Sequence, residues 1–196
     1  MAEPGTAEPA SLSNAPPSLN NIANWLTVAR IALVPIVVAG LLAGGTGWRL
    51  VALAAFGLAS VTDLLDGKVA RSRGLVTDFG KIADPVADKA LTGAALICLS
   101  ALGELWWWVT VLIMVRELGV TGLRFWVIRR GVIAASRGGK VKTLLQIIAI
   151  CLYILPWGNG ILRAVVMGAA VAATLVTGVD YLLRAVRLHR GKELAR

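Results

Sequence analysis

The sequence has few charged residues and almost no cysteine or histidine. Only 16% of its 196 residues are charged and 57% are hydrophobic, whereas about a quarter of the residues in a soluble domain are charged. The mean hydropathy is correspondingly high, at +0.75. This composition excludes an ordinary soluble domain, and the length fits one helical membrane domain better than two domains.

The scarce residue types exclude further classes of site. Cys98 and Cys151 both lie inside apolar stretches, where a free thiol behaves as a small hydrophobic side chain. Neither a disulfide nor a cysteine metal site is predicted. The single histidine, His189, lies in a basic segment, and we interpret it as facing solvent or lipid headgroups. Residues 1–19 lack the basic and apolar regions of a secretory signal, and their composition predicts a disordered cytoplasmic tail.

Six apolar stretches are long enough, or nearly so, to cross a bilayer as helices, which takes about 20 residues each. They cover residues 22–43, 48–66, 82–102, 105–128, 141–157 and 160–183. We therefore predict an all-α polytopic membrane protein with six transmembrane helices. The helical domain is predicted over residues 20–187, followed by a basic cytoplasmic tail over residues 188–196.

The basic residues are concentrated in alternate joins. Most of them lie in the loops at 67–81 and 129–142 and in the C-terminal tail. The whole chain has 20 basic and 11 acidic residues and thus a net charge of +9. With six spans these segments fall on one side of the membrane, which the positive-inside rule makes cytoplasmic. Both termini are then cytoplasmic, and a nucleic-acid-binding role is disfavoured. The Trp106–Trp108 run follows an outer join and is typical of an interfacial aromatic belt.

Two pairs of aspartates stand at the predicted cytoplasmic ends of the second and third spans. Asp63 and Asp66 are three residues apart, and Asp84 and Asp88 are four apart, so each pair shares one face of a helix. Carboxylates at a membrane boundary are costly to desolvate and indicate function. Four facing carboxylates suit two divalent cations, which take oxygen ligands and can clamp a phosphoryl displacement.

The residues around these acids suit a phosphate-bearing ligand. Gly67, Ala70 and Gly80 have little or no side chain, so a ligand can approach the backbone. Arg71 supplies a fixed positive charge for phosphate oxygens. A simpler interpretation is that the acids cap helices, as Asp84 before Pro85 would. Capping accounts for one acid and not for four.

The segment from Asp63 to Asp88 reads Asp-x2-Asp-Gly-x2-Ala-Arg-x8-Gly-x3-Asp-x3-Asp. It resembles the signature of the CDP-alcohol phosphotransferase family at all eight positions. The resemblance implies that family's fold and the transfer of a phosphatidyl or similar group from a CDP-linked donor to an alcohol, with release of CMP. It implies that the four aspartates bind two Mg²⁺ or Mn²⁺ ions and that Asp88 is the general base. The implied CDP-binding residues are Asp66, Gly67, Ala70, Arg71 and Gly80.

Motifs in the first, fourth and fifth spans narrow the resemblance within the family. Asn21-Ile22-x-Asn24-x-Leu26-Thr27-x2-Arg30, Arg116-Glu117 and Gly139-Lys140-x-Lys142-Thr143-x2-Gln146 are similar to bacterial phosphatidylglycerophosphate synthases. The similarity covers about residues 20–185. It implies CDP-diacylglycerol as donor, sn-glycerol 3-phosphate as acceptor, a bacterial plasma membrane and, as in many relatives, a homodimer.

Alternatives stay open within and outside the family. A phosphatidylinositol phosphate synthase also takes a phosphorylated alcohol, whereas a cardiolipin synthase needs fewer phosphate-binding cations. A divalent-cation transporter would place acids along the membrane depth, and here they gather at one boundary.

A dianionic acceptor phosphate needs cations of its own. Arg116 and Arg124 lie about two turns apart on one face of the fourth helix, and Lys140 and Lys142 enter the fifth helix. We predict these four as the acceptor phosphate-binding residues. For the two lysines, simple contact with anionic headgroups is an equal alternative. Glu117 is interpreted as orienting an arginine. Arg30 is left open between substrate contact and pairing with Asp180 or Glu117, and Tyr181 has no assigned role.

Overall fold

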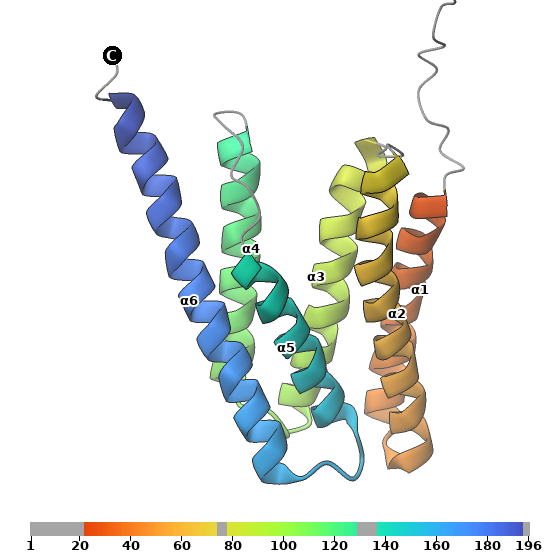
Figure 1. The fold of residues 1–196 in the computed structure, drawn as a ribbon. Coiled ribbons are helices and arrows are strands. Elements are labelled where there is room, and N and C mark those ends of the chain that lie inside the picture. Colours follow the sequence, from red (N-terminus) through yellow and green to blue (C-terminus); the bar gives the residue numbers. More distant parts are fainter. Residues whose placement is uncertain (1–21, 74–77, 129–136, 194–196) are drawn as a thin grey trace, which may run out of the picture.

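Over the residues that it describes, the computed structural model of the chain is a bundle of six α-helices (Figure 1). It describes residues 22–73, 78–128 and 137–193, with side chains over 25–63, 86–123, 138–183 and at 186. The helices are α1 (Ile22–Ala43), α2 (Gly45–Arg73), α3 (Asp78–Ala101), α4 (Trp107–Ile128), α5 (Arg137–Ile154) and α6 (Gly160–Glu193). The described ranges contain no strand, so the prediction of an all-α, six-helix chain is confirmed. The predicted tail at 1–19 lies outside the described residues.

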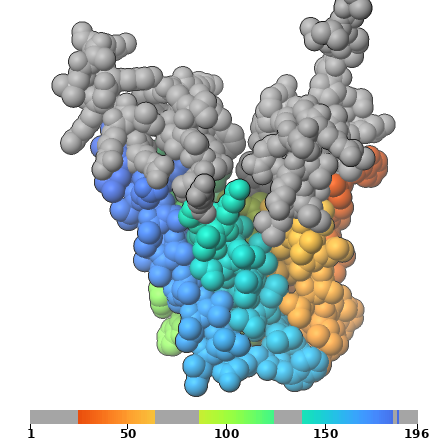
Figure 2. Space-filling view, viewed as in Figure 1, coloured from red at the N-terminus to blue at the C-terminus, as the bar shows by residue number. Residues whose placement is uncertain are grey.

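Successive helices run in opposite directions. The start of α1 and the end of α6 lie at the same end of the bundle, the upper end in Figure 1, together with the ends of α2 and α4 and the start of α3. α1 packs against α2 and α3, while α5 packs against α6 and contacts α2 and α3. Figure 2 shows α5 and α6 side by side on one face, with α2 beside α5. The basic segments therefore belong to helix ends that gather at one end of the bundle.

Several helix bounds differ from the predicted spans, by the most residues at the ends of α2 and α6 and at the starts of α3 and α5. α2 continues to Arg73 and α3 begins at Asp78, because hydropathy marks the extent of the lipid-facing stretch and not the end of hydrogen bonding along the helix. The N-cap interpretation of Asp84 is therefore wrong, since this residue lies inside α3. α5 starts at Arg137, inside the predicted basic loop at 129–142. The residues from this loop lengthen a helix whose apolar stretch is short. α6 runs on to Glu193, so most of the predicted basic tail is helical.

Glycine and asparagine set the helix ends at the lower end of the bundle. Gly44 and Gly45 have φ values of 70° and 74°, a left-handed conformation that glycine adopts without strain, and they turn the chain from α1 into α2. Gly40 lets the two helices approach closely, because a Cβ there would stand 2.8 Å from the carbonyl oxygen of Trp48. Asn159 caps α6: its Oδ1 accepts hydrogen bonds from the backbone N–H groups of residues 161 and 162.

An arginine ties the loops together at the same end. Arg49, in the first turns of α2, donates two hydrogen bonds to the Glu104 carboxylate at 2.6 and 2.7 Å. It also donates to the carbonyl oxygens of Tyr153 and Ile154 at the end of α5. Such a bidentate pair fixes geometry as well as charge, so α2, α5 and the α3–α4 connection are held in register.

Apolar side chains both fill the bundle and cover it. The buried apolar core includes Val37, Phe56, Leu96, Leu99, Ile113, Ile150 and Ile154. Many large apolar side chains are exposed, including Trp106, Trp107 and Trp108, where the belt prediction needs them. Among the described residues two helices are long and apolar enough to cross a membrane, Trp25–Ala43 and Gly160–Leu183. This surface suits a lipid environment and not water.

Candidate active site

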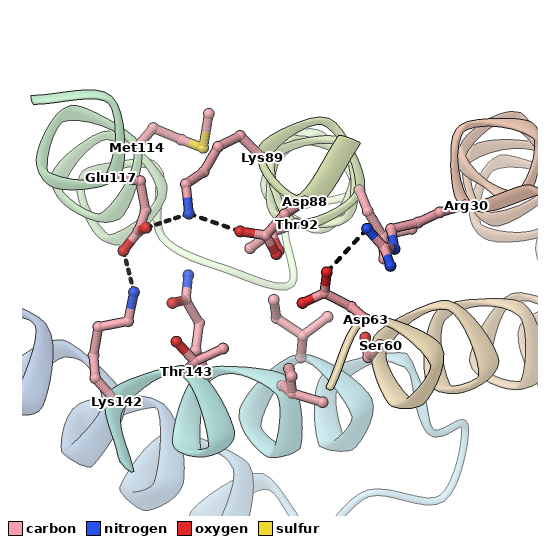
Figure 3. A pocket seen from close by; sticks show the side chains of 14 residues that line it. Arg30, Ser60, Asp63, Asp88, Lys89, Thr92, Met114, Glu117, Lys142 and Thr143 are labelled. Carbon is pink, nitrogen blue, oxygen red and sulfur yellow. Dashed lines mark hydrogen bonds and ion pairs between the residues drawn. The ribbon is translucent and has the colours of Figure 1, made fainter. Parts of the chain in front are cut away.

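A pocket opens among five helices of the bundle (Figure 3). Its lining combines ionised, neutral polar and apolar side chains. The residues that line it are Arg30, Ser60, Asp63, Asp88, Lys89, Leu91, Thr92, Met114, Glu117, Lys142, Thr143, Gln146, Ile147 and Ile150. These residues come from α1, α2, α3, α4 and α5. Charged side chains inside a membrane bundle are rare and mark a functional site.

Helical spacing brings these side chains to one place. On α3, Asp88 and Thr92 are four residues apart, and on α5, Lys142, Gln146 and Ile150 repeat every four residues, which aligns each set on one helix face. Gly93 brings α3 close to α4, since a Cβ there would stand 2.9 Å from the Met114 Cε.

Asp63 and Asp88, the signature aspartates whose side chains the structure describes, both face this pocket, each paired with a cation. Asp63 lies 2.9 Å from Arg30, whose side chain is 2% exposed, and Asp88 lies 2.8 Å from Lys89 (Figure 3). Arg30 thus pairs with a signature acid, which the sequence analysis did not consider. Because unpaired buried charges are strongly disfavoured, these pairs offset the cost of placing the two carboxylates within an apolar bundle.

Glu117 is the centre of a second set of ion pairs. Its carboxylate lies 2.7 Å from the Lys89 Nζ and 3.0 Å from the Arg116 Nη1, and it also binds the Lys142 Nζ. It is 4% exposed. Arg116 is held on its other side by the Thr177 hydroxyl at 2.8 Å. Glu117 therefore orients an arginine, as predicted, and two lysines in addition.

The charges of this Glu117 cluster do not cancel. Three cations, Lys89, Arg116 and Lys142, share two carboxylates, Asp88 and Glu117. Within this set of described side chains one positive charge is in excess, in a partly desolvated space where electrostatic attraction is stronger than in water. The cluster thus favours an anionic ligand next to Asp88.

The predicted site residues divide into three groups. Asp63, Asp88 and Lys142 line the same pocket. Arg116 stands beside it through Glu117, while Lys140 is exposed on α5. The side chains of the remaining predicted residues lie outside the described set: Asp66, Gly67, Ala70, Arg71, Gly80, Asp84 and Arg124.

Sequence reasoning missed Lys89 and Gln146 as members of the pocket. Lys89 directly follows the last signature aspartate, and Gln146 stands four residues after Lys142. The second spacing is a usable signal, because residues four apart share a helix face. For Lys89 no spacing rule applies, and its position depends on the approach of α3 to α4.

The carboxylates of the signature aspartates are suitable ligands for divalent metal ions. The described residues contain no group of three potential ligands, but Asp63 and Asp88 meet in one pocket. Asp66 follows Asp63 by about one turn of α2, and Asp84 precedes Asp88 by about one turn of α3. Carboxylate oxygens are the ligands that Mg²⁺ and Mn²⁺ favour.

Comparison with known proteins identifies the family. A family model described as CDP-alcohol phosphatidyltransferase matches residues 20–176, which include every helix that lines the pocket. The chain therefore belongs to the CDP-alcohol phosphatidyltransferase family, a membrane family, and the resemblance seen in the sequence is confirmed.

Individual relatives narrow the assignment. A probable phosphatidylglycerophosphate synthase of Mycobacterium tuberculosis is 53% identical over 172 residues, covering 85% of this chain and 82% of the relative. A Rickettsia felis protein named CDP-diacylglycerol–glycerol-3-phosphate 3-phosphatidyltransferase is 38% identical, covering 82% and 93%. A Bacillus subtilis protein of the same name is 45% identical over 143 residues, covering 66% and 74%.

Proposed function

We propose that the protein transfers a phosphatidyl group from CDP-diacylglycerol to sn-glycerol 3-phosphate, forming phosphatidylglycerophosphate and CMP. The observation that carries this proposal is the similarity, over most of the chain, to relatives whose names state that activity. The pocket supports it, because carboxylates and an excess of cations stand together inside an apolar bundle. A charged acceptor and a lipid donor would both find a suitable environment there.

The acids have two roles in this proposal. Asp63, Asp66, Asp84 and Asp88 would hold two Mg²⁺ or Mn²⁺ ions, which when bound would stabilise the charge developing on the phosphoryl oxygens. Asp88 takes the proton of the acceptor hydroxyl as that hydroxyl attacks the phosphorus. The Lys89 ammonium, fixed between Asp88 and Glu117, holds the Asp88 side chain in one orientation.

The remaining predicted residues would bind the two substrates. Gly67, Ala70 and Gly80 leave room for the CDP moiety, and Asp66 and Arg71 contact it. Lys142 is a buried cation of the pocket and would bind the acceptor phosphate, with Arg116, Arg124 and Lys140 as the other predicted contacts. The diacyl chains would remain between helices in the bilayer.

The setting of this reaction is also part of the proposal. The relatives are bacterial proteins, and we place the chain in the plasma membrane with its upper end, both termini and the pocket facing the cytoplasm. The catalytic domain would span residues 20–187. A homodimer is expected by analogy with the family.

Purified protein supplied with CDP-diacylglycerol, Mg²⁺ and sn-glycerol 3-phosphate is expected to release CMP, and EDTA is expected to abolish that release. Adding excess Mg²⁺ or Mn²⁺ should restore it, because the carboxylates depend on the metal for their proposed role. Inositol phosphate serves as the competing acceptor. CMP release with inositol phosphate alone would assign the protein to the phosphatidylinositol phosphate synthases, and activity that resists EDTA would contradict the metal proposal.

Lys142→Gln is expected to raise the KM for sn-glycerol 3-phosphate by about tenfold or more, because a hydrogen bond to a charged group is lost. The KM for CDP-diacylglycerol should change little. Lys140→Gln is the comparison variant: this lysine is also a predicted phosphate contact, but it is exposed on the same helix, so the KM should rise less than in Lys142→Gln. An unchanged KM for sn-glycerol 3-phosphate in both variants would mean that the lysines serve only topology or headgroup contact.

A further inference from the structure

Gln146 is buried, and its side-chain amide nitrogen has no hydrogen-bond partner among the described residues. It is 4% exposed, it lines the pocket, and within the described part of the chain its Nε2 makes no hydrogen bond. Buried polar groups in folded proteins are almost always hydrogen-bonded, and leaving one unpaired is costly. An unpaired amide aimed into a substrate pocket therefore indicates a group that is supplied by the ligand.

Several other buried neutral polar groups in the described part of the chain are hydrogen-bonded within the protein. Ser100 and Thr110 hydrogen-bond to each other at 2.7 Å, and Thr174 donates to the carbonyl oxygen of Ala170 at 2.6 Å. Thr143, which lines the same pocket as Gln146, donates to the carbonyl oxygen of Gly139 at 3.0 Å. The Tyr181 hydroxyl is also buried without a hydrogen bond among the described residues, but it does not line the pocket, whereas Gln146 does.

Gln146 lies between the charged and apolar parts of the pocket. On α5 it stands one turn after Lys142 and one turn before Ile150, and all three line the pocket. It is thus placed beside the proposed phosphate site but is itself neutral. A neutral amide is suited to a neutral polar group and is a poor choice for the main contact with a dianion.

The acceptor carries three polar groups, and two already have matching partners. Its phosphate suits the cations of the Glu117 cluster, and its attacking hydroxyl must reach Asp88. The group that remains is the hydroxyl on the middle carbon. Resting on the proposed function, we propose that the Gln146 amide donates a hydrogen bond to this C2 hydroxyl and so makes the pocket selective for acceptors with a second hydroxyl beside the reacting one.

A pair of acceptors tests this role. In 3-hydroxypropyl phosphate the C2 hydroxyl is missing, while the reacting hydroxyl and the phosphate are kept. The native protein is expected to use sn-glycerol 3-phosphate with a kcat/KM higher by about tenfold or more, because a site built around a hydroxyl rejects an analogue without it. The Gln146→Met variant keeps the length of the side chain but loses the hydrogen-bond donor. Its kcat/KM values for the two acceptors should therefore differ by no more than about threefold.

The fall should arise from poorer use of sn-glycerol 3-phosphate alone. Thr143→Val is the matched control: its hydroxyl lines the same pocket but is bonded to its own helix, so the ratio of the two acceptors should stay as in the native protein. Thermal unfolding checks folding, and Gln146→Leu is a second variant with the same expected ratio.

Three outcomes separate the possibilities. The inference is overturned if the native protein uses both acceptors equally, or if Gln146→Met keeps the native ratio of kcat/KM values. In either case the Gln146 amide contacts only water. A native protein with no activity on sn-glycerol 3-phosphate instead overturns the proposed function. A ratio that falls in Thr143→Val as much as in Gln146→Met would also contradict the specific role of Gln146.

Discussion

Asp88→Asn is expected to lower the rate of CMP release by about 10²- to 10⁴-fold, the usual contribution of a general base, while CDP-diacylglycerol binding stays largely intact. The asparagine amide has the same size but cannot take up the proton of the acceptor hydroxyl. Lys89 would not be left unpaired, because its Nζ also lies 2.7 Å from the Glu117 carboxylate. The loss should therefore appear in kcat, measured from CMP release, and not in folding.

Lys89→Met is the control for the loss of the ion pair. It removes the 2.8 Å pair with Asp88 but keeps the carboxylate, so its kcat should fall less than that of Asp88→Asn. If the two variants lose activity equally, Asp88 acts only through its pairing with Lys89. Full activity of Asp88→Asn would exclude it as the general base.

Glu117→Gln is expected to destabilise the protein by about 3–5 kcal/mol, the cost of removing one partner from a buried ion pair. Three cations depend on this carboxylate, namely Lys89, Arg116 and Lys142, and its side chain is only 5% exposed. Without it the cations repel one another and are no longer held beside the pocket. We expect a lower Tm in detergent and, in protein that folds, a higher KM for sn-glycerol 3-phosphate.

Glu104→Gln is the matched control for this variant. Glu104 also neutralises an arginine, Arg49, but at the opposite end of the bundle and with 23% of its side chain exposed. Exposed ion pairs contribute less than buried ones, so its Tm should fall less and its KM for sn-glycerol 3-phosphate should not change. A Glu117→Gln variant with native Tm and KM would show that the Glu117 cluster holds neither the fold nor the acceptor.

The signature aspartates show how much of the site can be predicted from the sequence. Their spacing placed each pair on one helix face, and the structure brings Asp63 and Asp88 into one pocket. Their cationic partners were not predictable in the same way. Arg30 lies 33 residues before Asp63, and no local rule links residues that far apart. Which cation neutralises which acid depends on how α1 packs against α2 and α3.

The charge of a residue in the sequence does not by itself show whether it binds the acceptor. Lys140 and Lys142 look alike in the sequence, yet one is exposed and the other is 4% exposed inside the pocket. Two residues along a helix correspond to more than half a turn, so the lysines point in different directions. The sequence contains that difference in direction, but only the packing of α5 shows which direction faces the pocket.

The sequence by itself determined the helical class, the number of helices and the positions of the acids, because hydropathy and residue spacing are local properties that need no partner. The tertiary structure decided the rest: the length of α2 beyond its apolar stretch, the sharing of Glu117 by three cations, and the burial of Gln146 without a partner. The physical reason is that ion pairing and burial depend on distances between helices. Those distances are set by close approaches such as that of α3 to α4 at Gly93, and no single stretch of the chain specifies both sides of such a contact.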